Sequence, residues 1–310
     1  MSSFRSGFVA VVGPANAGKS TLVNRLVGEK ISIVSPKAQT TRNRILGIKT
    51  TDTAQLVLID TPGYFPDDGQ EKPVRRGALE QTLREVSADS LSGVDQIMLV
   101  LDAERAVRHH GYLDSVLNTL NRNSGVQLTV IAINKIDLVE KIALLPLFER
   151  LAGMFPGRSA ELIPVSARSG DGIAELEQLL IGRLPEGDCL YPEDQVTDVS
   201  ERFIASEVIR EKLFGVLEQE LPYSVAVTIE SWEEQPKLLK IRANILVERE
   251  SQKGIVIGKG GQVLKKIGER ARLDLEKILD NHIFLELFVR VDDNWTETPA
   301  GLRRAGVVNG

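Results

Sequence analysis

A glycine-rich loop, Gly13 to Ser20, has the residue types and the spacing needed to bind phosphate. It reads GPANAGKS, follows the apolar run FVAVV and opens the helix-like segment STLVNRLVG. In this context glycines let backbone N–H groups approach phosphate oxygens, and the helix N-terminus adds positive potential. Lys19 would reach the β and γ phosphates, and the Ser20 hydroxyl could bind Mg²⁺. The predicted nucleotide contacts in this loop are Gly13, Asn16, Ala17, Gly18, Lys19, Ser20 and Thr21.

The tetrapeptide NKID, Asn134 to Asp137, predicts which base is bound. It stands at the end of the strand-like run QLTVIAI. The Asp137 carboxylate can accept hydrogen bonds from the N1 and N2 hydrogens of guanine. Adenine does not offer these donors, so ATP would leave a buried charge without a partner. Asn134 would tie this loop to the phosphate loop, and Lys135 is a further predicted contact. The pattern therefore predicts a guanine nucleotide.

Two more polar clusters follow strand-like runs. Asp60 to Gly63, DTPG, comes after AQLVLI, where Asp60 is placed to hold Mg²⁺ through water and the Gly63 amide can sense the γ-phosphate. The tripeptide after ELIPV could offer the Ala167 amide to the O6 atom of guanine; its residues are Ser166, Ala167 and Arg168. Four such clusters at strand ends, in this order, predict a guanine-nucleotide triphosphatase of the P-loop class.

A second glycine-rich loop, GKGG, occupies Gly258 to Gly261. No Ser or Thr follows its lysine, so it lacks the Mg²⁺ ligand of a nucleotide loop. It fits the GXXG loop of a KH domain, whose backbone clamps single-stranded nucleic acid. Residues 252–273 hold six basic side chains and one acidic side chain, a basic island in a chain of net charge −5. The predicted RNA contacts are Ile257, Gly258, Lys259, Gly260, Gly261, Lys265, Lys266 and Arg270.

The elements that must position these loops fall into two groups. In the first, short apolar strands alternate with helical segments, which predicts an α/β P-loop domain with a mostly parallel sheet. RILGIKTT and AQLVLID are joined by a short polar turn, which predicts one antiparallel strand. The second group reads α-β-β-α-α-β, the order of an α+β, type II KH domain. We predict a GTPase domain over 1–184, a linker over 185–200, a KH domain over 201–293 and a flexible tail over 294–310.

Composition sets wider bounds on the molecule. The chain of 310 residues is 42% hydrophobic, which is enough for two packed domains. Its one cysteine, Cys189, excludes an intramolecular disulfide and fits a reducing cytoplasm. No apolar run approaches the length of a membrane span, although peripheral contact with a membrane stays open.

The motifs together resemble the Era GTPase family across nearly the whole chain. They are GPANAGKS, SPKAQTTRNRI, DTPGY, NKID, SAR, the linker LYPEDQVTD and IGKGG. The resemblance implies a bacterial cytoplasmic switch, monomeric, that hydrolyses GTP with Mg²⁺ and acts in assembly of the small ribosomal subunit. It points to the 3′ end of small-subunit ribosomal RNA as the partner. It also leaves open a peripheral association with the cytoplasmic face of the inner membrane.

The resemblance further implies that SPKAQTTRNRI is switch I, with Thr41 as the Mg²⁺-binding threonine and Thr40 as the alternative. Lys19, Thr41 and Gly63 are then the predicted catalytic residues. The predicted Mg²⁺ ligands are Ser20, Thr41 and Asp60.

Two questions about catalysis stay open. Tyr64 follows DTPG, where Ras-like GTPases carry the glutamine that orients water, so intrinsic hydrolysis should be slow. Asn16 occupies the position at which related GTPases hold K⁺, which would stabilise the charge that develops between the phosphates. The alternative function is an RNA-binding assembly scaffold that holds GTP as a structural ligand with negligible turnover.

Overall fold

The chain is organised as two units, each with its own β-sheet. The computed structural model describes residues 4–35, 37, 40–63, 78–109, 111–116, 128–154, 160–218 and 221–307, without the side chains of residues 80, 84 and 87–89. The first unit comprises Met1–Val74 and Leu83–Asp198, and the second comprises Arg75–Thr82 and Val199–Gly310.

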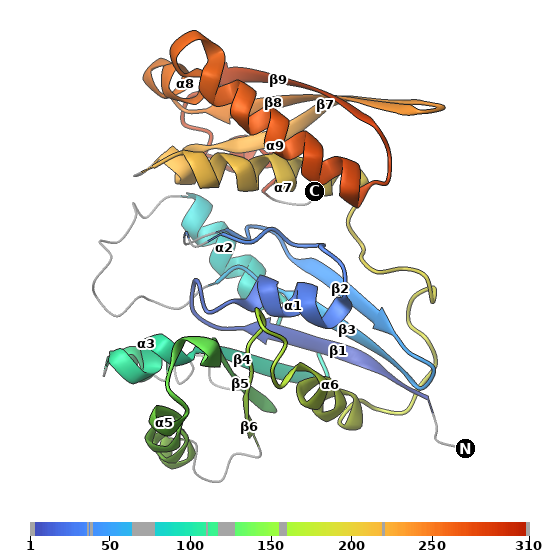
Figure 1. The fold of residues 1–310 in the computed structure, drawn as a ribbon, viewed down its shortest axis with the longest axis vertical. Coiled ribbons are helices and arrows are strands. Elements are labelled where there is room, and N and C mark those ends of the chain that lie inside the picture. The colour runs from blue at the N-terminus through green and yellow to red at the C-terminus, as the bar shows by residue number, and fades with distance from the viewer. Residues whose placement is uncertain are drawn as a thin grey trace. The chain divides into compact units, whose positions relative to one another are not determined.

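Among the described residues of the first unit, six strands form one sheet in the order β2-β3-β1-β4-β5-β6 (Figure 1). They are β1 (Arg5–Val12), β2 (Ile45–Thr50), β3 (Ala54–Asp60), β4 (Gln96–Asp102), β5 (Val130–Asn134) and β6 (Glu161–Pro164). β2 runs antiparallel to β3, whereas the other neighbouring strands are parallel. Every residue of β3 and β4 is buried, as expected for strands covered on both faces. The predicted mostly parallel sheet with one antiparallel strand is confirmed.

The helices of the first unit follow the strands as the sequence pattern predicts. They are α1 (Lys19–Val27), α2 (Ala78–Asp89), α3 (Ala103–Arg108), α5 (Lys141–Met154), α6 (Ile173–Gly182) and the short 3₁₀ helix η1 (Ile136–Leu138). The start of α2, as far as Thr82, is counted with the second unit. α1 and α6 contact each other and the strands β1 to β3, whereas α3 and α5 pack together in a separate cluster with β4 and β5. None of the described helices is long and apolar enough to cross a bilayer.

The proline-rich and acidic segment predicted as a linker is bonded to the first unit as far as Asp198. The Ile48 amide donates to the Val196 carbonyl at 2.9 Å, and the Leu46 amide donates to Asp198 Oδ1 at 3.0 Å. The fully buried Gln55 accepts from the amide of Tyr191 at 2.9 Å and donates to its carbonyl at 2.9 Å. The bonds to Leu46 and Ile48 pair backbone groups on the outer edge of β2, which would otherwise be unpaired.

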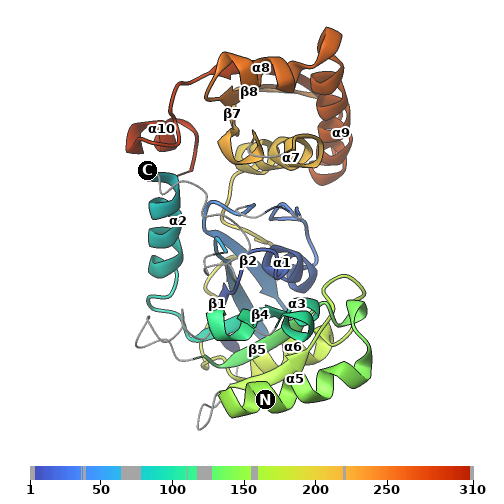
Figure 2. The same ribbon diagram turned by 90° about the vertical axis from the view of Figure 1, so that its left-hand side faces the viewer.

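The second unit has the predicted element order α-β-β-α-α-β. Its elements are α7 (Glu201–Val216), η2 (Leu221–Ser224), β7 (Ala226–Gln235), β8 (Leu238–Val247), α8 (Glu250–Ile257), η3 (Lys259–Gly261), α9 (Gln262–Ile278), β9 (Ile283–Val291) and α10 (Pro299–Arg304). β8 lies between β7, which is antiparallel to it, and β9, which is parallel. α7 and α9 contact each other on one side of this sheet (Figure 2). Ile267, Ala271 and Leu275 of α9 are buried at helical spacing and form its core face.

The segment after residue 293 differs from the expected flexible tail. Trp295 is fully buried, and its indole N–H donates to the Ser224 carbonyl at 3.2 Å. The Thr298 hydroxyl caps α10, and Leu302 and Val307 are buried. The described part of the segment, up to residue 307, therefore packs as part of the second unit, because its apolar side chains find a core that the polar sequence around them did not reveal.

Candidate nucleotide site and nucleic-acid interface

The phosphate loop between β1 and α1 is shaped by close approaches that only glycine permits. Gly13 has φ +146°, and a Cβ there would lie 2.3 Å from the Val100 carbonyl oxygen. Gly18 has φ +93°, and a Cβ there would lie 2.3 Å from Asn134 Nδ2. Both positions combine a positive φ with contact to a neighbouring strand, so a side chain at either would displace the loop.

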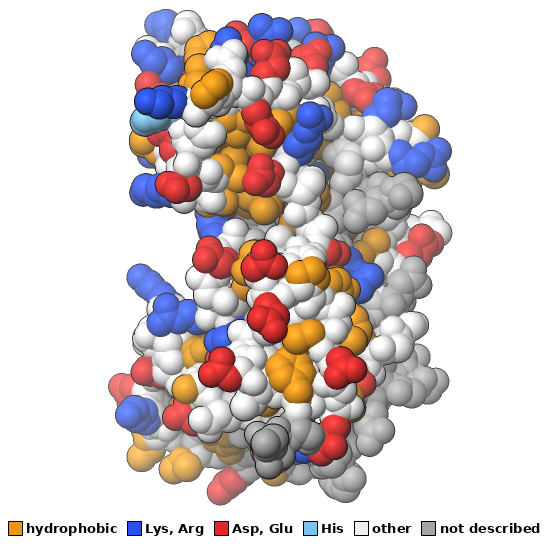
Figure 3. Space-filling model, turned by 90° about the vertical axis from the view of Figure 1, so that its right-hand side faces the viewer, with side chains coloured by type: hydrophobic (Ala, Val, Ile, Leu, Met, Phe, Trp, Pro, Cys, Tyr) orange, Lys and Arg blue, Asp and Glu red, His pale blue; other side chains and the backbone are white. Residues whose placement is uncertain are grey.

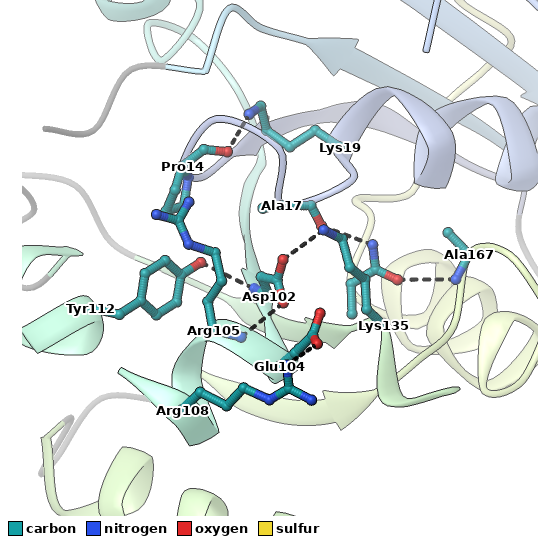
Figure 4. A network of polar contacts seen from close by, with 11 residues as sticks. Pro14, Ala17, Lys19, Asp102, Glu104, Arg105, Arg108, Tyr112, Lys135 and Ala167 are labelled. Atoms are coloured by element: carbon teal, nitrogen blue, oxygen red, sulfur yellow. Dashed lines mark hydrogen bonds and ion pairs between the residues drawn. The ribbon is translucent and has the colours of Figure 1, made fainter. Parts of the chain in front are cut away.

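Lys19 is buried inside this loop. Its ammonium group donates to the carbonyl oxygens of Gly13 and Pro14, each at 3.0 Å. Figure 4 shows the bond to Pro14. Burial lowers the pKa of Lys19 to about 8, and the nearby Asp60 charge opposes this shift. The loop therefore fixes the lysine by its own carbonyl groups, in a place where an added negative charge would favour the protonated form.

Asp60, at the end of β3, has the surroundings of a cation ligand. It is fully buried, and neither carboxylate oxygen has a well-formed hydrogen bond from the described residues. Burial raises the pKa of Asp60, while the Ser20 hydroxyl and the Lys19 ammonium oppose the rise. The Ser20 and Thr41 hydroxyl oxygens lie 2.9 Å apart. Such hard oxygen donors fit Mg²⁺, and a bound cation would account for the unbonded oxygens of a buried carboxylate.

The described part of switch I separates the two candidate threonines. Both Thr40 and Thr41 line a pocket together with Lys19, Ser20 and Gly63. The Thr40 hydroxyl donates to the Lys37 carbonyl at 2.6 Å, whereas the Thr41 hydroxyl contacts Ser20. This arrangement favours Thr41 as the metal ligand.

Gly63 lies directly over the phosphate loop. A Cβ on this residue would be 2.8 Å from Lys19 Nζ and 3.0 Å from Ala15 Cα. The backbone of DTPG thus approaches the place where the end of a triphosphate would lie. Tyr64, on which the expectation of slow hydrolysis rests, lies outside the described residues.

The predicted base loop is joined to the phosphate loop by Asn134. Its side-chain amide donates to the Ala17 carbonyl at 2.9 Å, as the motif predicts. The exposed Asp137 carboxylate accepts a hydrogen bond from the Ser166 hydroxyl at 2.7 Å. The NKID and SAR segments thereby hold each other at neighbouring strand ends.

One backbone amide of the SAR segment is bonded within the protein. The Ala167 amide donates to Asn134 Oδ1 at 3.0 Å, and its predicted contact with guanine O6 stays a prediction. The Asn134 side chain reaches this amide because the same residue bridges to the phosphate loop. The Arg168 side chain is exposed, and its predicted contact with a nucleotide stays a prediction.

One residue near the base loop was not predicted from the sequence. Asp102, the last residue of β4, accepts a hydrogen bond from Lys135 Nζ at 2.6 Å (Figure 4). It is a carboxylate at the end of an apolar strand, the same signal that identified Asp60. A search for a carboxylate at the end of every apolar strand would therefore have identified Asp102.

The second glycine loop, GKGG, joins α8 to α9 and is open. Gly258, Gly260 and Gly261 have φ angles of +73°, +59° and +77°. A Cβ on Gly258 would lie 2.4 Å from the Val263 side chain, but one on Gly260 or Gly261 would meet nothing within 4 Å. Gly260 and Gly261 thus leave free space beside the backbone. Ile257, also predicted to touch RNA, is half-buried at the end of α8.

Four of the basic side chains in this region carry no acidic partner among the described residues. They are exposed and are the ones predicted to bind RNA: Lys259, Lys265, Lys266 and Arg270. By contrast, Lys253 pairs with Glu250 at 3.8 Å and Arg272 pairs with Glu276 at 2.9 Å. Figure 3 shows Lys and Arg side chains along the margin of the second unit on which α9 lies. The loop and α9 therefore present positive charge that the protein does not neutralise.

Two family models match the chain. The model described as a 50S ribosome-binding GTPase matches residues 8–135, and the model of the KH domain matches residues 220–296. The curated relatives include GTPase Era of Geobacter sp. (strain M21), which is 45% identical over 98% of each chain. GTPase Era of Neisseria meningitidis serogroup C is also 45% identical, over 98% of this chain and 95% of the relative.

Two solved structures match this chain over nearly its full length. A crystal structure of Era in complex with MgGDPNP and nucleotides 1506–1542 of 16S ribosomal RNA is 37% identical, with a TM-score of 0.89 over 99% of this chain and 100% of the other. A tyrosine-to-alanine variant of Aquifex aeolicus Era bound to GDP and AlF₄⁻ is 38% identical, with the same TM-score and coverage. At this identity and coverage, the chain belongs to the Era family of GTPases.

Proposed function

We propose that this chain is a GTP-hydrolysing switch that binds small-subunit ribosomal RNA through its KH unit during assembly of the small ribosomal subunit. The observation that carries the enzymatic part is Asp60, a fully buried carboxylate beside the Ser20 hydroxyl and the buried Lys19, with no well-formed hydrogen bond to either of its oxygens among the described residues. A protein that bound no metal and no triphosphate would gain nothing from burying these charges together.

The residues around Asp60 would have separate roles in binding the metal ion and the phosphates of GTP. Ser20 and Thr41 would ligate Mg²⁺ directly and Asp60 through water, and the bound ion would offset the charge of the β and γ phosphates. Lys19 would exchange its loop carbonyls for phosphate oxygens and stay protonated there. Gly63, which approaches Lys19 closely, would report the γ-phosphate through its amide. Loss of that contact after hydrolysis would release the DTPG segment, which is the switching event.

The base is selected by Asp137 at the NKID loop. One carboxylate oxygen is oriented by the Ser166 hydroxyl, and the other is available to the N1 and N2 hydrogens of guanine. Asp137→Asn should therefore weaken GTP binding and favour xanthine nucleotides, whose exocyclic oxygen replaces the guanine amine. Titration calorimetry with GDP and with xanthosine diphosphate measures this exchange, and an unchanged preference for GDP would reject the assignment.

The RNA partner is proposed from the open GKGG loop and from the relatives. Four exposed cations without acidic partners among the described residues flank a backbone with free space beside it, which suits a single strand clamped at its phosphates. The relative crystallised with nucleotides 1506–1542 of 16S ribosomal RNA supports the 3′ end as the bound element. Crosslinking the intact protein to RNA in cells, and sequencing the fragments, tests this choice. A cytoplasmic location fits this partner, whereas a monomeric state and peripheral membrane association stay predictions.

Single-turnover hydrolysis separates the switch from the alternative scaffold that holds GTP structurally. The protein, in excess, is mixed with radiolabelled GTP, with and without an RNA that contains the 3′ end, and phosphate release is followed. A switch should turn over slowly alone and faster with RNA, and Asp60→Ala should abolish both rates. GTP that stays intact through many dissociation half-lives, with or without RNA, would establish the scaffold instead.

A further inference from the structure

Asp102 holds three groups at the end of β4, next to the predicted base loop. Its Oδ2 atom accepts from Lys135 Nζ at 2.6 Å, and its Oδ1 atom accepts from the Arg105 amide at 3.1 Å as the N-cap of α3. Its own amide donates to the Tyr112 hydroxyl oxygen at 3.1 Å. Figure 4 shows these contacts converging on one residue. The Asp102 side chain is only 3% exposed, so its charge is balanced within the protein.

Lys135 is constrained at both ends. Its backbone has φ +66°, which is uncommon for a residue with a side chain, and its neighbour Asn134 is bonded to the phosphate loop. Its Cε atom lies 4.0 Å from where a Cβ of Gly18 would be, so the side chain passes beside that loop. The ion pair with Asp102 then fixes the ammonium group, although 30% of the side chain is still exposed.

We propose that Asp102 is a positioning residue for nucleotide binding: it anchors the Lys135 ammonium so that the methylene stem forms a wall of the base pocket. The proposal rests on the guanine-nucleotide function proposed above. Without its anchor, Lys135 is a flexible cation with three rotatable donors beside a phosphate site. Binding a nucleotide would then cost the conformational entropy of ordering the Lys135 side chain. The ion pair with Asp102 orders this side chain before the nucleotide binds, so that cost is avoided.

The consequence is a loss of affinity that GTP and GDP share. The base is the same in both nucleotides, so Asp102→Asn should weaken both by about tenfold. The hydrolysis rate at saturating GTP should change by less than about twofold, because Asp102 contacts neither Lys19 nor Asp60. Asparagine also caps helices well, so the bond to the Arg105 amide can persist.

A double-mutant cycle tests whether Asp102 acts through Lys135. GDP affinity is measured by calorimetry for the wild type, Asp102→Asn, Lys135→Met and the double variant. Asp102→Asn should weaken GDP binding about tenfold in the wild type and less than about twofold beside methionine, which has a similar stem but no charge. Equal losses in both backgrounds would mean that Asp102 acts only as the cap of α3, and would overturn the proposal. So would unchanged GDP affinity of Asp102→Asn.

Melting temperatures give a second readout that does not depend on the nucleotide. Lys135→Met alone should lower the melting temperature, because it leaves the buried Asp102 charge without its ion pair, and adding Asp102→Asn should restore it. A melting temperature that falls further in the double variant would contradict the pairing. Glu104→Gln is the matched control. Glu104 lies two residues after Asp102 and pairs with Arg108 at 2.6 Å, and no contact between Glu104 and Lys135 occurs among the described residues.

Two additions keep the outcomes distinct. Asp102→Ser retains a capping oxygen and replaces the asparagine variant in the cycle if that variant does not fold. Asp137→Asn is titrated in parallel with GDP and xanthosine diphosphate. A switch of base preference there with no effect of Asp102→Asn rejects only the positioning role, whereas no effect of either variant rejects the guanine site itself.

Discussion

Gly260 and Gly261 of the GKGG loop serve a different purpose from Gly13 and Gly18 of the phosphate loop. In the phosphate loop, a side chain at Gly13 or Gly18 would collide with the protein's own atoms at 2.3 Å. In the GKGG loop, Gly260 and Gly261 face open space, and only their left-handed backbone requires glycine. The phosphate loop is packed tightly against neighbouring strands, whereas the GKGG loop leaves open space beside its backbone in which a nucleic-acid strand could bind.

Charge follows the same division. The phosphate loop buries one lysine, and burial lowers its pKa to about 8. The GKGG loop exposes its lysine among other cations that lack acidic partners in the described part of the chain. Exposed charges are screened by salt and buried ones much less. The comparison therefore teaches that nucleotide binding should depend on internal geometry, and RNA binding on accessible charge and ionic strength.

The largest effect should come from Gly18→Ala. The added Cβ would strike the Asn134 side chain and strain a residue at φ +93°, so the bond that joins the phosphate and base loops would break. GDP affinity should fall by at least about a hundredfold in calorimetry, while RNA affinity stays within about twofold.

Gly28→Ala is the matched control for that prediction. Gly28 caps the other end of α1 at the same φ of +93°, but a Cβ there would meet nothing within 4 Å. It should lower stability by about 1 kcal/mol and leave GDP affinity unchanged. If both variants bound GDP equally well, the phosphate loop would not depend on the close approach.

Gly260→Asp should abolish RNA binding and leave nucleotide affinity intact. It places a side chain and a negative charge where the loop backbone would meet phosphate. Filter binding to a 3′-end RNA and GDP calorimetry measure the two activities. Gly306→Asp adds the same charge at a similar φ of +71° in open space, outside the loop, and should bind RNA normally. RNA affinity that survives in Gly260→Asp would reduce GKGG to a turn.

The sequence predicted the loops better than the segments around them. Parallel strands bring their carboxyl ends to one edge, so Asp60, Asn134 and Ser166 could be placed together from their positions in the chain alone. Asp102 obeyed the same rule and was missed because no motif contains it. The linker and tail lack periodicity, and their order depends on partners distant in sequence. Gln55 inside an apolar strand and Trp295 inside a polar tail were the local signals that such partners exist.

A smaller effect is expected from the monovalent cation. Asn16 has φ +63° at the edge of the phosphate loop, where K⁺ could stabilise the charge that develops between the β and γ phosphates. Replacing K⁺ by Na⁺ at constant ionic strength should slow GTP hydrolysis several-fold, and Asn16→Ala should erase the difference. Equal rates in both salts would reject the ion and direct attention to Arg42 or to a group supplied by the ribosomal partner.

The smallest expected effect is on RNA affinity, when the charge of Lys259 is removed from the GKGG loop and its glycine backbone is kept. Lys259→Ala removes one exposed cation without an acidic partner among the described residues, so RNA affinity should fall only a few-fold at low salt. The slope of log affinity against log salt should become shallower by about 0.7, the value for one phosphate contact on a single strand. Lys253→Ala is the control, because Lys253 is paired with Glu250 and should leave the slope unchanged. If Lys259→Ala also kept the wild-type slope, the loop would hold RNA through its glycine backbone, and the accessible charge that distinguishes it from the phosphate loop would belong to α9 alone.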